Sequence, residues 1–414
     1  SPSPPSPLPP GFPNNLGSKP LLGWRSWQAT SLEVNQSFME QIMDGIIKIH
    51  TGVNSSREHT SLQAAGYMDV GLDAGYESPG KGVGGGCHNS SGHMIINSNF
   101  PSLKEMTNHA HTLSLTASWY LNSDACKGEN ETMVGETYRQ DSHDAVFYGF
   151  DGVKFDSEYG GPNHNITAWA VALNATGKQM MIENCLNKNP PWMHPGADPS
   201  YCPMNFYRSG PDNSPSFHGG LMHVYTWAVP FLNSVTPSSS TDPPPSSRPG
   251  CFAYPDMLGI GAPIKGSIAW EQARLQGCAN MSIAEERTLF ANWVIISSPL
   301  VLAIDTRDDS VMMKYLPIVG NKRALAINQD WAGYAGQLLK QSNNTVERYT
   351  PIGARCEQNS TTSLPEWLVY TKPLSANGGG VAALFINLSD TPVSFELTVM
   401  ELITAGAPHE CDFS

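Results

Sequence analysis

The sequence predicts a (β/α)₈ barrel followed by a small antiparallel β-sandwich. Short apolar segments alternate with helical patterns over roughly the first 330 residues, and from about residue 335 the chain changes to β-rich segments separated by turn signals. Strands that alternate with helices form parallel sheets, and about eight such units in about 300 residues are typical of a barrel. We therefore divide the chain into a Pro/Ser-rich segment (1–19), a barrel (20–334) and a sandwich (335–414).

The barrel prediction depends on eight apolar segments that read as strands. They are 21–27, 67–74, 113–121, 151–156, 179–186, 206–210, 254–261 and 299–305. Helical patterns lie between them at 36–49, 164–177 and 282–298. The last of these opens with Ser282 and Glu285, the spacing of a capping box. The sandwich prediction depends on "EWLVYTKPL", "GGVAALFINLS" and "TPVSFELTVMEL".

Two segments rich in proline and serine lie outside this pattern. "SPSPPSPLPPGFP" opens the chain and is typical of a polyproline II spacer, which suggests association with a cell wall or matrix. "SVTPSSSTDPPPSSRPG" at 234–250 has no apolar periodicity and reads as a long surface insertion.

Composition excludes several classes of protein. Lys+Arg number 24 and Asp+Glu 37, a net charge of −13 without a basic patch, which disfavours nucleic acid and anionic membranes as partners. No apolar run reaches the length of a membrane span. No signal-peptide pattern is present, so we interpret the chain as a mature form.

Cysteines and glycosylation motifs indicate a secreted glycoprotein. The cysteine count is even, none forms a C-x-x-C pair, and up to four disulfides are expected. The cysteines are Cys87, Cys126, Cys185, Cys202, Cys251, Cys278, Cys356 and Cys411. Ten N-x-S/T motifs are candidate glycosylation sites, at Asn35, Asn54, Asn89, Asn130, Asn165, Asn174, Asn280, Asn343, Asn359 and Asn387.

Carboxylates at the ends of predicted strands are the candidate catalytic groups. The strand 151–156 ends in Asp156, and the period of two places Lys154 on the same face. Another strand reaches Asp73, and Arg208 is followed by Asp212. Active sites of such barrels lie at the carboxyl ends of the strands, and two facing carboxylates suit glycoside hydrolysis. The alternative for Asp156, and for Asp212 in "SGPDNSP", is an ordinary cap or turn.

These motifs resemble the melibiase-like retaining glycosidases, the α-galactosidase and α-N-acetylgalactosaminidase family. The resemblance runs from about residue 20 to the C-terminus. It is carried by "GWRSW", "AGYMDVGLDAGY", "GVKFD", "ALNATGK", the Arg208–Asp212 spacing, "YPDMLGIG", "SSPLVLAIDTR" and "ALAINQDWAG".

The resemblance implies a role for each matching residue. Asp156 would be the nucleophile and Asp212 the general acid and then base. Lys154, Arg208 and Asp73 would bind sugar hydroxyls, and Trp27 would form an apolar wall. The activity would be that of an exo-glycosidase without a cofactor, acting on an oligosaccharide or glycoconjugate. Cys185 and Cys202 fall where the family has a disulfide between the fifth and sixth strand regions.

The chain also departs from the family pattern. One of two paired aspartates is Ala74, a tryptophan is replaced by Tyr76, and Leu186 stands where a sugar-binding carboxylate is expected. Ser157–Glu158 replace a Gly-Cys pair, so Cys87 becomes the expected partner of Cys126. "FAY" (252–254) replaces "WND". In a regular strand Glu183 points away from the face of Leu186.

These departures leave two functions open. The first is hydrolysis of terminal α-galactosides or of β-L-arabinopyranosides, which lack only the hydroxymethyl group of galactose. The alternative is an inactive family member that binds carbohydrate or has a structural role. We interpret Asp256 and Asp305 as structural residues at the barrel rim. "GKGVGG" lacks the helix of a dinucleotide site, and the histidines at 88, 93, 109 and 111 lack the spacing of a metal site.

Overall fold

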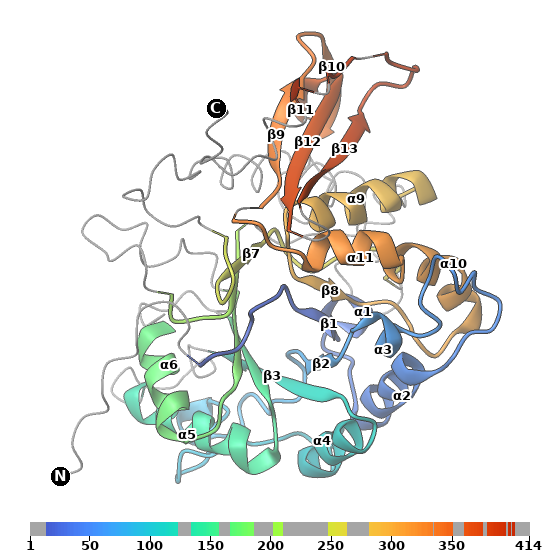
Figure 1. Cartoon of the computed structure of the whole chain (residues 1–414). Helices are drawn as coiled ribbons and strands as arrows, with labels where there is room; N and C mark the ends of the chain where they lie inside the picture. Colours follow the sequence, from blue (N-terminus) through green and yellow to red (C-terminus); the bar gives the residue numbers. More distant parts are fainter. Residues whose placement is uncertain are drawn as a thin grey trace, which may run out of the picture.

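The computed structural model shows a curled parallel sheet with helices around it and antiparallel sheets at one end (Figure 1). The structure describes residues 14–122, 134–156, 166–185, 202–209, 247–262, 281–333, 335–350, 360–375, 379–394, 396–398 and 400–401. The predictions for residues 1–13, Leu186 and Asp212 therefore concern residues outside the described ranges.

The central sheet has eight strands, all of them parallel to their neighbours. They are β1 (Leu22–Arg25), β2 (Asp69–Leu72), β3 (Thr116–Asn122), β4 (Gly152–Asp156), β5 (Met181–Asn184), β6 (Phe206–Arg208), β7 (Phe252–Tyr254) and β8 (Leu300–Leu302). Their order is β7-β6-β5-β4-β3-β2-β1-β8. Beyond β7, the Leu258 N–H donates to the Val301 carbonyl oxygen of β8 at 2.8 Å, which joins the two ends of the sheet.

The predicted strands match this sheet except at one place. The expected strand at 254–261 is wrong, because β7 covers Phe252–Tyr254 and ends where that segment begins. Pro255 follows at once and has no N–H to donate to a strand ladder. The apolar residues Met257, Leu258 and Ile260 are buried in the connection after the strand, so burial alone misled the prediction.

Helices lie between the strands. They are α1 (Trp27–Thr30), α2 (Gln36–Ile47), α3 (Leu62–Ala65), α4 (Leu103–Thr112), α5 (Val134–Tyr148), α6 (Ile166–Ala175), α9 (Ile283–Ile295), α10 (Asp309–Val319) and α11 (Lys322–Gln329), with a 3₁₀ turn, η1, at Val83–Gly85. The predicted capping box of α9 is confirmed. The Glu285 N–H donates to Ser282 Oγ at 3.3 Å, and the Ser282 N–H donates to Glu285 Oε2 at 2.6 Å. No helix of the described residues is long and apolar enough to cross a membrane.

Two apolar clusters stabilise the barrel. The larger contains the outward-facing residues of the strands, such as Val153 and Phe155, together with the inner faces of the helices. The smaller contains Phe206 of β6, Phe252 and Tyr254 of β7, Val301 of β8 and Met257 of the connection after β7. Because these strands lie at the two ends of the sheet order, their meeting shows that the sheet curls around an interior.

The C-terminal region is antiparallel, as the sequence predicts. Its strands are β9 (Gln337–Gln341), β10 (Thr345–Thr350), β11 (Ser360–Pro365), β12 (Trp367–Leu374) and β13 (Gly380–Asn387). They form one sheet of order β13-β12-β9 and a second of β10-β11. The described part of the expected strand at 391–402 forms no strand. Packing of the two sheets into a sandwich stays a prediction.

A buried lysine joins this region to the barrel. Lys372 of β12 is fully buried, and its ammonium group donates to the carbonyl oxygens of Ile327 and Asn328 in the last turn of α11. A cation suits the C-terminal end of a helix, where carbonyl groups lack partners within the helix. Burial nevertheless lowers the pKa of Lys372 to about 7, while Asp330 acts in the opposite direction.

We expect this lysine to make stability depend on pH. Its pKa is about 7 in the folded state against an ordinary 10.5, so the folded protein binds fewer protons between these values. The free energy of unfolding should therefore rise with pH above 7, by at most about 1.4 kcal/mol per pH unit. Calorimetric melting at pH 7, 8 and 9 should show this rise in the wild type and a weaker one in Lys372→Met. If the stability of the two proteins changes with pH in the same way, the prediction for Lys372 is wrong.

Candidate active site

The sequence-predicted site residues lie at the carboxyl ends of neighbouring strands. In the sheet register, Phe155 pairs with Asn184 and Asn184 with Tyr207. Phe155 and Tyr207 belong to the larger apolar cluster, which contains the outward-facing residues of the strands and is called the outer cluster below. Because side chains alternate between faces, the next residue of each strand points inward. Asp156, Cys185 and Arg208 therefore form one row at the mouth of the barrel.

Lys154 and Asp73 form a buried ion pair next to this row. Lys154 Nζ lies 2.6 Å from Asp73 Oδ2, and both side chains are almost fully buried. The ammonium group also lies 5.5 Å from the centre of the Tyr120 ring of β3, within cation–π range. The structure thus brings together two residues 81 positions apart that the sequence assigned to one site.

The electrostatic environment keeps Lys154 charged. Burial by itself would lower the pKa of Lys154. The carboxylate of Asp73, with smaller effects from Asp156 and Glu183, outweighs this and holds the pKa well above its usual value. The site therefore keeps a cation two residues before Asp156 at every physiological pH. A cation near a carboxylate favours its ionised form, and a nucleophilic carboxylate must be ionised.

Arg208 lies at the end of the row opposite Asp156. Its Nη1 donates to Cys185 Sγ at 3.3 Å and lies 3.7 Å from Asp256 Oδ1. Asp256 is buried, and its backbone carbonyl accepts from Trp293 Nε1 at 3.0 Å. The interpretation of Asp256 as a structural rim residue stays a prediction, and its carboxylate faces a candidate sugar-binding arginine. Asp305 is structural as expected, since its carboxylate binds the Arg307 guanidinium and N–H.

A charged cluster lies deeper in the barrel. Arg25 of β1 lies 2.5 Å from Asp69 of β2 and 3.0 Å from Glu183 of β5. Glu183 also accepts a hydrogen bond from the Tyr254 hydroxyl of β7. Strands β1 and β5 are not neighbours in the sheet, so these side chains meet across its interior. Arg25 was not among the predicted site residues, although a charged residue within the predicted strand 21–27 was a signal for it.

Trp27 and Tyr76 have different surroundings. Trp27 is partly buried and packs against both apolar clusters, the larger one and the smaller one that contains Phe206 and Val301. Tyr76 is fully buried outside the barrel, where its ring lies 5.1 Å from that of Trp119 and its hydroxyl donates to the Tyr120 carbonyl. Ala74 belongs to the same outer cluster.

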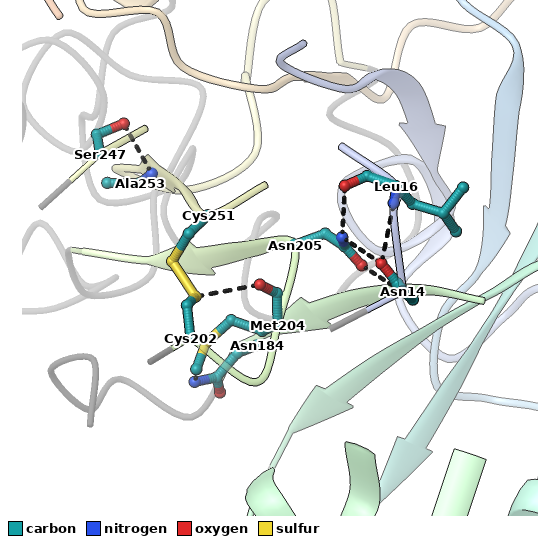
Figure 2. The surroundings of a disulfide bond; sticks show 9 residues. All are labelled: Asn14, Leu16, Asn184, Cys202, Met204, Asn205, Ser247, Cys251 and Ala253. Atoms are coloured by element: carbon teal, nitrogen blue, oxygen red, sulfur yellow. Dashed lines mark hydrogen bonds between the residues drawn. A yellow bond between two sulfur atoms is a disulfide. The ribbon is translucent and has the colours of Figure 1, made fainter. Parts of the chain in front are cut away.

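The disulfide expected between Cys185 and Cys202 is wrong. Cys202 is bonded to Cys251, with a Cα–Cα distance of 6.2 Å, and Cys185 is a buried free thiol. Figure 2 shows this bond beside the start of β6. Cys202 and Cys251 precede the parallel neighbours β6 and β7, whereas Cys185 follows β5. Because Cys202 is already bonded to Cys251, it cannot also bond Cys185.

The same region binds the start of the described chain. Asn205 exchanges hydrogen bonds with Asn14 at 2.8 and 2.9 Å and donates to the Leu16 carbonyl at 2.9 Å (Figure 2). Residues 14–17 thus contact the barrel, although the sequence placed them in the spacer. Cys87 is disulfide-bonded, and its expected partner Cys126 is not among the described residues.

Each of the four histidines considered as metal ligands lies within hydrogen-bond distance of a carboxylate. The pairs are His88–Asp141 at 3.0 Å, His93–Asp144 at 2.8 Å, His109–Asp44 at 3.0 Å and His111–Asp151 at 2.8 Å. Within the part of the chain that the structure describes, no three His, Cys, Asp or Glu side chains gather in a way that could hold a metal ion.

A carboxylate, a protonated lysine and an arginine at the carboxyl ends of parallel barrel strands are compatible with the active site of a barrel glycoside hydrolase. The family model described as alpha galactosidase A matches residues 19–330 of the 414. The protein belongs to this family and is an enzyme.

Individual relatives agree with this assignment. "Probable alpha-galactosidase" of Dictyostelium discoideum is 25% identical over 392 residues, which cover 93% of this chain and 81% of that protein. Human "Alpha-galactosidase A" is 24% identical over 348 residues, covering 80% and 71% of the two chains. The solved alpha-galactosidase of Saccharomyces cerevisiae superposes with a TM-score of 0.68 at 17% identity, over 98% of this chain and 80% of that one. The superposition shows that the fold is shared.

Proposed function

We propose that the protein is a secreted retaining exo-glycosidase that hydrolyses terminal α-galactosides and β-L-arabinopyranosides by double displacement. The observation that carries the proposal is the row of Asp156 and Arg208 beside the Lys154–Asp73 ion pair. Membership of the alpha galactosidase A family supports the same sugar class. Disulfides such as Cys202–Cys251, together with the N-x-S/T motifs, support secretion.

The proposed reaction has two steps. In the first, the Asp156 carboxylate attacks the anomeric carbon, and the glycosidic oxygen leaves with a proton from Asp212. In the second, Asp212 takes a proton from water, whose oxygen displaces Asp156 from the sugar. Two inversions at one carbon retain its configuration. Lys154, Arg208 and Asp73 bind the sugar hydroxyls, with Trp27 against the apolar face of the ring.

The arabinopyranoside part of the proposal comes from Ala74. This position lacks a carboxylate, and its methyl group belongs to the outer apolar cluster. Asp73 then binds the sugar without the neighbouring carboxylate that the family pattern has. In a site built to bind the hydroxymethyl group, a sugar without it leaves a buried partner unpaired and loses binding free energy. In the present site no such partner is left unpaired, so the loss of binding free energy is smaller.

The test is a panel of p-nitrophenyl α-D-galactopyranoside, α-D-N-acetylgalactosaminide and β-L-arabinopyranoside. We expect hydrolysis of the galactoside and the arabinopyranoside, with kcat/KM values within about tenfold of each other. Proton NMR of the first product should show the configuration of the substrate. If galactose is released but arabinose is not, the proposal that the enzyme hydrolyses arabinopyranosides is wrong. If the folded protein hydrolyses none of the three substrates, a non-catalytic sugar-binding role is favoured. A product of inverted configuration would exclude the retaining mechanism.

A further inference from the structure

Cys185 occupies a central place in the site. It follows β5, and its N–H donates to the Phe155 carbonyl of β4 at 2.8 Å, which continues the parallel register by one residue. Its side chain therefore projects between that of Asp156 on β4 and that of Arg208 on β6. Strands in a sheet lie about 4.8 Å apart, so a residue in this position separates its two neighbours in the row.

The contacts of Cys185 are polar. Arg208 Nη1 donates to its Sγ at 3.3 Å, and the same nitrogen lies 3.7 Å from Asp256 Oδ1. The sulfur takes part in no disulfide. It is thus available as a hydrogen-bond acceptor, a role that the sulfur of a thiol can fill weakly.

The thiol carries no charge. Burial raises the pKa of Cys185 well above its usual value, and the nearby carboxylates Asp156 and Asp256 act in the same direction. Arg208 and Lys154 oppose this without reversing it. A neutral group therefore stands between the candidate nucleophile and a candidate sugar-binding cation.

We propose that Cys185 is a positioning residue that holds the Arg208 guanidinium next to Asp256 and away from Asp156. This inference rests on the proposed function. A guanidinium that paired with both oxygens of Asp156 would form a strong charge-assisted contact and make the carboxylate a weaker nucleophile. Held by the thiol and Asp256, the Arg208 guanidinium instead stays at the mouth of the barrel, where the sugar would bind.

Two substitutions separate this role from simple packing. Cys185→Ser keeps a polar acceptor but leaves a small void, whereas Cys185→Val fills the space and removes the acceptor. We expect the serine variant to stay within about threefold of wild-type kcat/KM and the valine variant to lose about tenfold, the effect of one hydrogen bond to a charged group. A packing role predicts the reverse order.

The pH profile of kcat/KM gives a second readout. In Cys185→Ala, which removes both the acceptor and the volume between the two side chains, Arg208 can approach Asp156 and lower its pKa, so the acid limb should move to lower pH by about one unit. Cys185→Ser should keep the wild-type limb. The control is Ile182→Val, a small substitution on the outer face of the same strand that should change neither limb nor kcat/KM.

Mass spectrometry of unreduced, alkylated protein tests the premise independently of activity. Alkylated Cys185 together with a linked Cys202–Cys251 peptide pair would support the inference, and a disulfide at Cys185 would overturn it. Wild-type protein that hydrolyses the panel, with serine and valine variants alike, would overturn the inference alone. A wild type inactive on every sugar would overturn the proposed function and this inference with it.

Discussion

Replacement of Asp156 by asparagine is expected to lower kcat by about 10³-fold or more, as removal of a catalytic nucleophile does elsewhere. Asp156 is half-buried at the end of β4, two residues after the charged Lys154. An amide of the same size keeps the packing but cannot form the glycosyl ester. The measurement is kcat on the best aryl glycoside of the panel, with a thermal melt of each protein to show that it is folded.

The matched control is Asp151→Asn, the same substitution at the other end of the same strand. Asp151 accepts hydrogen bonds from the Ala117 N–H at 3.0 Å and from His111 at 2.8 Å. At the amino ends of barrel strands such contacts serve stability, so we expect a lower Tm with kcat within roughly twofold of wild type.

Chemical rescue identifies the role of Asp156 directly. In Asp156→Gly, added azide can enter the space of the lost carboxylate and attack the anomeric carbon, expelling the nitrophenolate. The product should be a glycosyl azide of inverted configuration. If Asp156→Asn keeps more than about a tenth of wild-type kcat, the nucleophile lies elsewhere, because loss of a true nucleophile costs far more.

Arg25→Met should be the most destabilising substitution in the barrel interior. It leaves the carboxylates of Asp69 and Glu183 buried without their shared cation. Breaking a buried ion pair by removing one partner costs about 3–5 kcal/mol, because the remaining charge keeps its desolvation penalty. Thermal melting at neutral pH should show a large fall in Tm.

Arg307→Met provides the comparison for this effect. Arg307 makes two hydrogen bonds to the Asp305 carboxylate, at 2.7 and 2.8 Å, but is exposed to solvent. Exposed pairs contribute about 0–1 kcal/mol, so its Tm should change little. Equal losses for Arg25→Met and Arg307→Met would show that the interior cluster contributes no more than a surface pair.

Local patterns accounted for most of the predicted fold. The alternation of strands and helices, the capping box at Ser282 and the antiparallel C-terminal region all depend on residues close together in the chain. The strand predicted at 254–261 failed because a buried connection is as apolar as a buried strand. Only the pairing of Phe252–Tyr254 with β6 distinguishes the two.

The site was predicted in part. The spacing of Lys154 and Asp156 follows from the period of a strand, and both residues lie where the sequence placed them. The strand period assigned Glu183 to one face of its strand. It could not show that Glu183 contacts Arg25 and Tyr254. Cys185 was expected in a disulfide because the family pattern has one there, and the pattern contains no distances.

The sequence by itself determined the barrel class, the candidate nucleophile and the family, because these depend on periodicity and on motifs that are contiguous in the chain. The tertiary structure decided which distant residues meet: Lys154 with Asp73, Arg25 with Glu183, and Cys202 with Cys251. The physical reason is that ion pairs and disulfides form only within a few ångströms. Which strand ends come that close depends on the register and curl of the whole sheet.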